Sequence, residues 1–151
     1  MKNIILQLVF FFSVINVFSQ NNETEYSKFI NSKYLSKSQT IKRNDISEKI
    51  LYLGEIHLKD SLFYIITSFK RVKAAIDYHG HSSIYILDRN KKIIKEYVLD
   101  LPEQLPFKIE DNNLCFKYLD EKTKTNKIFI YKFENKIPEL LCLNFSTEEC
   151  F

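Results

Sequence analysis

The sequence from Ile50 to Phe133 is a series of short apolar runs, and this regularity constrains the fold more than any other feature of the chain. The runs are rich in isoleucine, tyrosine and phenylalanine, and polar or proline-containing breaks separate them at the roughly 8 to 12 residue spacing that is typical of all-β domains. They predict strands at residues 50–58, 62–72, 73–78, 83–88, 92–99, 107–111, 113–120 and 127–133. Because the breaks are too short to hold crossover helices, we expect neighbouring strands to be antiparallel.

The expected fold is mainly β: an antiparallel meander of about eight strands, folded as a sandwich or a barrel-like sheet, with one short N-terminal helix. Residues 127–133 alternate cleanly, with Ile128 and Ile130 on one face of the strand and Phe129 and Tyr131 on the other. Several other runs carry apolar residues on both faces, which suits a sheet that is covered on two sides.

The N-terminal helix is expected behind the polar residues that follow Gln20. The apolar residues Tyr26, Phe29, Ile30 and Tyr34 recur there at helical spacing. Residues 37–45, KSQTIKRND, are polar and show no period, so they predict a linker between this helix and the strands.

The first 19 residues have the pattern of a secretory signal peptide. One lysine precedes an apolar run from Ile4 to Phe18, and cleavage is expected between Ser19 and Gln20. The run of 15 residues is shorter than the roughly 20 that span a membrane, which disfavours an uncleaved anchor and any stable insertion after cleavage. We therefore expect an exported protein, periplasmic, cell-surface or extracellular. The expected organisation is a signal peptide at 1–19, a polar segment with the short helix at 20–48, and an antiparallel β domain at 49–151.

The charge balance disfavours nucleic acid as a partner. Removing residues 1–19 takes away one lysine and no acidic residue, which leaves 21 basic and 19 acidic residues and a net charge of +2. Nucleic-acid binding proteins normally carry a strong basic excess. Here the basic residues alternate with acidic ones, as in KRNDISEK and DEKTKTNK, which is typical of an ordinary solvated surface.

Three cysteines are expected to meet an oxidising environment after export. Cys142 and Cys150 are close enough to form a C-terminal disulfide around LNFSTEE, whereas Cys115 lies in an apolar run and is expected to be a core thiol.

Glycine is scarce, and its scarcity excludes several enzyme classes. Gly54 and Gly80 are the two glycines of the chain, so neither phosphate-binding glycine loop nor the G-x-S-x-G nucleophile motif can be formed. The H-E-x-x-H motif is also absent, and Ser82 beside His81 lacks the context of a nucleophile. No cofactor is expected.

The stretch DYHGHSS, residues 77–83, permits two interpretations. In one extended strand Asp77, His79 and His81 would share a face, and His57 from a neighbouring strand would complete a metal site. Alternatively, Gly80 supplies the positive φ of a tight hairpin whose tip carries the histidines. We favour the hairpin, because a glycine weakens a continuous strand.

Aromatic residues offer a different surface. Tyrosine and phenylalanine make up 18 of the 132 residues after Ser19, and most are expected to fill a core that has no tryptophan. A part of this set, Tyr78, Tyr85 and Tyr97, is a candidate partner-binding face, because tyrosine is enriched at protein interfaces.

These features favour a small exported β domain that acts by binding a protein partner, as an accessory, inhibitor or immunity-type protein, rather than by catalysis. One alternative is a metal-binding protein or metal-dependent hydrolase that uses Asp77, His79, His81 and His57. A second is a structural subunit of a surface assembly, which would associate through an exposed edge strand.

Overall fold

The computed structural model describes residues 25–151 apart from 75–76, 121 and 145–147, and the side chains of residues 74, 77, 78, 144, 148 and 149 are also outside this description. The predicted signal peptide at 1–19 lies outside the described residues. In chain order the strands are β1 (Ser38–Arg43), β2 (Ile46–Leu58), β3 (Ser61–Ala74), β4 (Asp77–Leu87), β5 (Ile93–Leu99), β6 (Lys108–Glu110), β7 (Asn113–Asp120), β8 (Thr125–Lys132), β9 (Cys142–Asn144) and β10 (Glu148–Cys150). Three short 3-10 turns accompany them: η2 (Ser27–Phe29), η3 (Ser32–Tyr34) and η4 (Pro102–Gln104).

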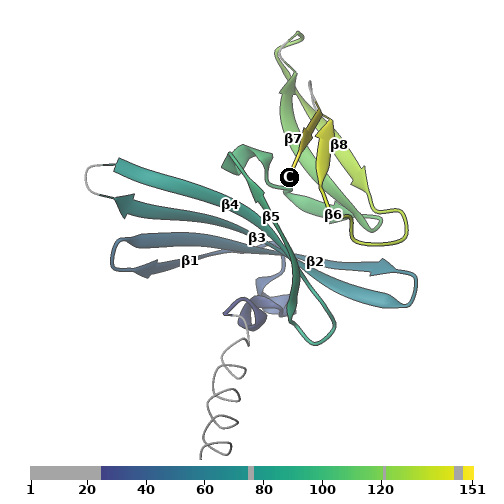
Figure 1. Ribbon diagram of the computed structural model, residues 1–151, viewed down its shortest axis with the longest axis horizontal. Helices are drawn as coiled ribbons and strands as arrows, with labels where there is room; N and C mark the ends of the chain where they lie inside the picture. The colour runs from purple at the N-terminus through teal and green to yellow at the C-terminus, as the bar shows by residue number, and fades with distance from the viewer. Residues whose placement is uncertain (1–24, 75–76, 121, 145–147) are drawn as a thin grey trace, which may run out of the picture.

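The described strands form two antiparallel sheets and a separate hairpin. The large sheet has the order β1-β2-β3-β4-β5, the small sheet has the order β6-β7-β8, and β9 pairs with β10. In Figure 1 the small sheet and the β9–β10 hairpin lie above the large sheet, and the N-terminal turns lie below it; we call these two sides of the large sheet its upper and lower faces. The expected mainly β, antiparallel and sandwich-like architecture is confirmed.

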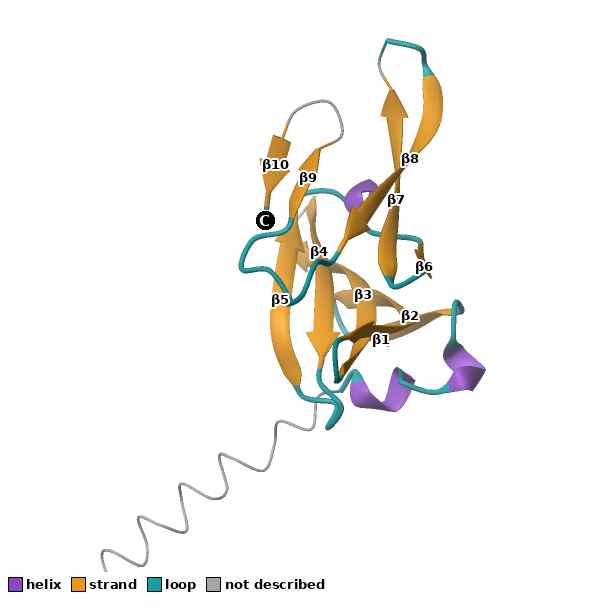
Figure 2. Cartoon of the chain, turned by 90° about the vertical axis from the view of Figure 1, so that its right-hand side faces the viewer, coloured by secondary structure: helices purple, strands orange, loops and turns teal. Residues whose placement is uncertain are grey.

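The upper face of the large sheet contributes to the main core. Ile56, Ile65, Ile84 and Ile86 are fully buried there, and they form one cluster with Leu114 and Phe116 of the small sheet, with Leu141 just before the hairpin and with Leu143 of β9. Phe129 and Tyr131 of β8 also pack against this cluster, whereas Ile128 and Ile130 are exposed, as the alternation of residues 127–133 predicts. Strand pairing acts within each sheet, and burial of these apolar faces against each other holds the two sheets together (Figure 2).

A β-bulge in β2 keeps apolar side chains on the upper face along the strand. The register with β3 shifts between Tyr52 and Gly54, and Gly54 has φ of +128°, which side chains rarely allow. Because the bulge adds one residue, Leu53 before it and Ile56 after it both join the main core although three positions separate them.

The N-terminal segment folds as two 3-10 turns, so the expectation of one amphipathic helix is wrong. Asn31, between η2 and η3, has extended backbone angles, and its side chain accepts a hydrogen bond from the backbone N–H of Lys33. This local bond competes with helix formation. Phe29 and Ile30 are nevertheless buried, in a second cluster on the lower face that includes Ile50 and Ile66.

Residues 37–45 contain a strand rather than the expected linker. β1 pairs with β2 along its whole length, from Ser38 opposite Leu51 to Arg43 opposite Ile46. β1 is an edge strand, and edge strands tolerate polar sequences because solvent covers one side of them. Ile41 alone of its residues packs against the lower cluster, which explains why periodicity did not indicate a strand.

Candidate functional site

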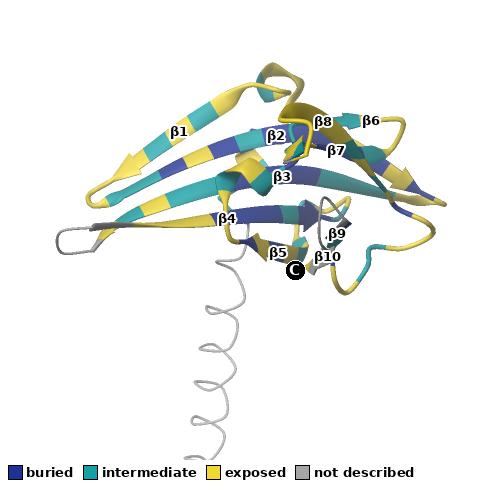
Figure 3. Ribbon diagram, turned by 90° about the horizontal axis from the view of Figure 1, so that it is seen from above, coloured by how far each residue is buried: buried dark blue, intermediate teal, exposed yellow. Residues whose placement is uncertain are grey.

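The strands of the large sheet continue well beyond the cover that the small sheet provides. β2, β3 and β4 have 13, 14 and 11 residues, whereas the longest strands of the small sheet have 8. In Figure 1 the small sheet lies above one end of the large sheet, and Figure 3 shows the opposite end of β1–β4 exposed. This uncovered end therefore presents the upper face of long, paired strands to solvent.

On the upper face of this end, strand register brings basic side chains together. Lys42 lies opposite Ser47, which lies opposite Arg71, and the next row contains Thr40, Lys49 and Phe69. Lys73 follows Arg71 on the same face of β3, because alternate residues of a strand point the same way. We call Lys42, Lys49, Arg71 and Lys73 the open basic face; all four are exposed.

A pocket of about 460 Å³ lies within the open basic face, and Lys42, Arg71 and Lys73 line it. The β1–β2 turn forms its rim. Asn44 adopts φ of 47°, a conformation that asparagine tolerates better than most residues, and the backbone N–H of Lys73 donates a 2.8 Å hydrogen bond to the carbonyl of Asp45. Backbone geometry therefore shapes this pocket.

The pocket has a strong excess of positive charge. Asp45 is the acidic residue among those that line it. Within the described part of the chain, no carboxylate forms an ion pair with Lys42, Lys49 or Lys73. Such a concentration of one sign of charge in a concave surface attracts anionic groups from solution.

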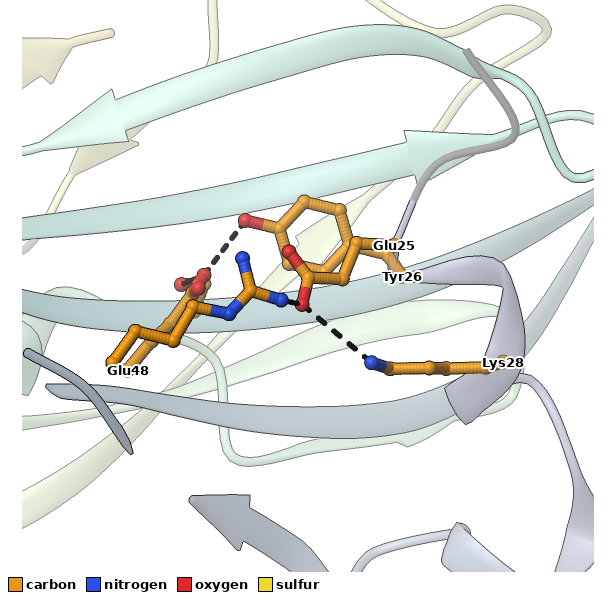
Figure 4. A network of polar contacts seen from close by, with 6 residues as sticks. Glu25, Tyr26, Lys28 and Glu48 are labelled. Carbon is orange, nitrogen blue, oxygen red and sulfur yellow. Dashed lines mark hydrogen bonds and ion pairs between the residues drawn. The ribbon is translucent and has the colours of Figure 1, made fainter. Parts of the chain in front are cut away.

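The N-terminal segment covers part of the lower face of the same end. The Glu48 carboxylate is 8% exposed, and it accepts hydrogen bonds from Tyr26 Oη at 2.7 Å and from Ser68 Oγ at 2.5 Å (Figure 4). Burial raises the pKa of the Tyr26 hydroxyl, and the hydrogen bond to Glu48 adds to this shift. Glu25 pairs with Arg43 of β1 and with Lys28. These contacts fix the segment below the sheet, whereas the cations of the upper face are exposed.

The residues DYHGHSS belong to an unbroken strand, so the prediction of a hairpin tip at Gly80 is wrong. β4 runs from Asp77 to Leu87, and Gly80 pairs with Arg71. Gly80 is not among the residues with positive φ. A Cβ atom there would lie 2.9 Å from the Phe69 ring, so the glycine makes room for an aromatic ring from the adjacent strand.

His79 and His81 share the lower face of β4, as the metal hypothesis requires, but His57 lies far from them. His57 pairs with Leu62 at one end of β3, whereas His81 pairs with Lys70, eight residues along the same strand. At 3.3 Å per residue this separation is about 26 Å. Among the described residues, no group of three potential metal ligands lies together. The structure therefore does not bring His57 close to His79 and His81, and the four-residue metal site is not formed.

The tyrosine candidates do not form a common exposed face. Tyr97 is 1% exposed, and its hydroxyl donates a hydrogen bond to the Pro138 carbonyl at 2.5 Å, so it belongs to the main core. Tyr85 stacks on Tyr26 of the N-terminal segment, with ring centroids 4.4 Å apart. The side chain of Tyr78 lies outside the described residues. The interface prediction is thus wrong for Tyr97, and Tyr85 is partly covered by the chain itself.

The cysteine predictions hold. Cys142 and Cys150 form a disulfide that ties β9 to β10, and Cys115 is a free, fully buried thiol. Burial raises the pKa of Cys115 and favours its neutral form.

Sequence reasoning missed the open basic face because charges that alternate along the chain cancel in a simple count. In KRNDISEK the strand pleat sends Lys42, Ser47 and Lys49 upward and Glu48 downward, where its carboxylate is buried. The signal that could have revealed the face is the sign of the charge at every second position, once residues 42–49 are assigned to strands.

No helix in the described residues is long and apolar enough to cross a membrane. Comparisons with protein-family models, with curated proteins and with solved structures gave no match.

Proposed function

We propose that this protein is a small, exported binding domain without catalytic activity, and that it holds its partner on the open basic face. The observation that carries the proposal is the uncovered upper end of the large sheet, where exposed cations surround a pocket of about 460 Å³. The apolar side chains of the upper face are buried where the small sheet lies, and the cations of the open end are exposed. The remaining surface is available for a partner.

Two features support binding rather than catalysis. The Cys115 side chain is fully buried and Ser82, beside His81, is also fully buried, so neither candidate nucleophile is accessible to a substrate. The site that is accessible has more cations than acidic groups, and its excess of positive charge suits recognition of a surface by complementary charge.

Export is supported by two independent features. The first 19 residues have the pattern of a signal peptide, and the Cys142–Cys150 disulfide is consistent with an oxidising environment. The partner is therefore expected outside the cytoplasm.

Site-specific photo-crosslinking tests this function. A photoreactive amino acid is placed at Thr40, which is exposed on the upper face of β1, and a matched control carries it at Lys136, an exposed residue between β8 and β9. We expect a defined adduct with a protein of the exported fraction from Thr40 and no such adduct from Lys136. Equal adducts from the two positions, or none from Thr40, would contradict the proposed binding face.

The edge strand β8 favours assembly as a second candidate function. β8 has one neighbouring strand among the described residues, and its outward Ile128 and Ile130 are 55% and 45% exposed. Exposed apolar edge strands can pair with further chains. Sedimentation analysis over a range of concentrations tests this candidate: self-association that Ile128→Lys abolishes would support assembly, and a monomer at all concentrations would contradict it.

A further inference from the structure

The cations of the open basic face are spaced like the alternate side chains of an extended polypeptide. We propose that it binds an acidic polypeptide segment, with carboxylates at alternate positions, that lies along β2 and β3; this rests on the proposed function and specifies the chemistry of its partner.

The pleat of the sheet separates the charges of this region. Lys42, Lys49, Arg71 and Lys73 share the upper face, while Glu48 points to the lower face and is buried there with Tyr26 and Ser68. The carboxylate that balances the lysines in the sequence is therefore separated from them by the sheet. The upper face retains an excess of positive charge over Asp45, the acidic residue of its pocket, and this excess is complementary to an acidic partner.

The spacing of the cations selects an extended segment. Arg71 and Lys73 are two residues apart on β3, so their Cα atoms lie about 7 Å apart along the strand. Lys49 lies on the neighbouring β2 opposite Phe69, so it is displaced from Arg71 by one strand spacing of about 5 Å across the sheet and by two residues, about 7 Å, along it. An extended segment repeats its own side chains at the same interval of about 7 Å, so acidic residues at alternate positions meet successive cations of the sheet.

The neutral groups of the face suit a polypeptide better than a membrane or a nucleic acid. Asn44 and Ser47 line the pocket and can hydrogen-bond to main-chain amides, and Phe69 adds an apolar contact beside Lys49. A flat bilayer surface reaches a recessed site that is formed by a turn poorly.

The test uses the exported, disulfide-bonded protein and a fluorescent peptide of alternating glutamate and serine. Fluorescence anisotropy at low salt measures its affinity, and a peptide with the same glutamates in one block tests the spacing. We expect the alternating peptide to bind severalfold more tightly than the blocked peptide, and both to weaken as salt increases.

Charge reversal locates the site. Lys42→Glu with Lys73→Glu is expected to weaken binding of the alternating peptide by about tenfold, because attraction becomes repulsion at two contacts. The matched control, Lys122→Glu with Lys136→Glu, makes the same change in net charge at exposed residues away from this face and should weaken binding by about twofold or less. Unchanged melting temperatures show that each variant is folded.

Three outcomes would overturn the proposal. Equal losses of affinity in the two charge-reversed proteins would show that binding depends on net charge alone. Equal affinities for the alternating and the blocked peptide would show that the spacing of the cations does not select the partner. Tighter binding to vesicles of phosphatidylcholine and phosphatidylglycerol in equal parts, or to single-stranded DNA, would assign the face to another class of partner. An adduct at Thr40 in the crosslinking experiment would still support the proposed function in each case, so the two failures are distinguishable.

Discussion

The covered and the open ends of the large sheet use the same strands and the same face for different purposes. On the upper face of β3, Ile65 is fully buried beneath the small sheet, whereas Arg71, six residues further along the same face, is exposed. On the upper face of β4, Ile86 and Ile84 are likewise fully buried, whereas Gly80 at the open end is exposed. Alternation continues along each strand, but the residue type changes where the cover ends. The comparison teaches that stability is concentrated under the small sheet and that the open end is free to carry charge.

The largest expected effect is the difference in the free energy of unfolding between a substitution at the covered end and one at the open end. Ile84→Ala removes a fully buried side chain from the main core and should lower the free energy of unfolding by about 3 kcal/mol. Lys49→Ala, on the open basic face, should change it by less than about 0.5 kcal/mol. Chemical denaturation of the two variants measures both values. Similar losses would show that the open end also holds the fold together.

The disulfide ties the C-terminal hairpin, which contributes to the main core, at the covered end. Cys142→Ser with Cys150→Ser removes a link across eight positions and should destabilise the protein by about 2.5 kcal/mol on loop-closure grounds. The buried Leu141, just before the hairpin, and Leu143 of β9 should then become more accessible, which amide hydrogen exchange detects. An unchanged denaturation midpoint relative to the oxidised wild type would mean that the disulfide does not stabilise the covered end.

Gly80 tests whether the open end has packing of its own. Gly80→Ala places a methyl group 2.9 Å from the Phe69 ring and should cost about 1 kcal/mol. In a Phe69→Leu background the cost should fall close to zero, because the ring that crowds the position is gone. The double-mutant cycle measures this coupling. Equal costs in the two backgrounds would indicate that the ring does not determine the need for glycine.

The smallest effect at neutral pH concerns Tyr52 on the lower face. Burial, with a smaller contribution from the Glu55 carboxylate, raises the pKa of Tyr52 from 10.0 to about 12. Since the folded state holds the proton more tightly than the unfolded state, this contribution to stability is present below pH 10 and is lost as the pH rises from 10 to 12. Tyr52→Phe should make the fall in stability over this window shallower. A decline that is the same in the variant and the wild type would show that Tyr52 is not responsible.

The sequence predicts the covered end better than the open end, for a physical reason. A covered strand must alternate or be apolar throughout, so residues such as Phe129, Ile130 and Tyr131 reveal both the strand and its faces. β1 carries no such pattern, because neighbouring β2 supplies its hydrogen bonds while solvent surrounds most of its side chains.

Features that depend on tertiary contacts could not be predicted from the sequence. From the sequence, Gly80 was predicted to supply the positive φ of a turn, whereas in the structure the ring of Phe69 leaves no room for a Cβ atom at this position. The open basic face was hidden because Glu48 compensates Lys49 along the chain but not across the sheet. The Cys142–Cys150 disulfide was predictable because a pair so near in sequence needs little knowledge of the fold.

Lysine footprinting in the presence of the native exported fraction tests the division of the sheet most directly. Acetylation rates are measured for the isolated protein and again after addition of that fraction. The account predicts that Lys42, Lys49 and Lys73 become severalfold less reactive while the exposed Lys122 and Lys136 keep their rates. Unchanged rates on the open basic face, with protection of Lys122 or Lys136 instead, would contradict the claim that the uncovered end of the large sheet is the binding surface.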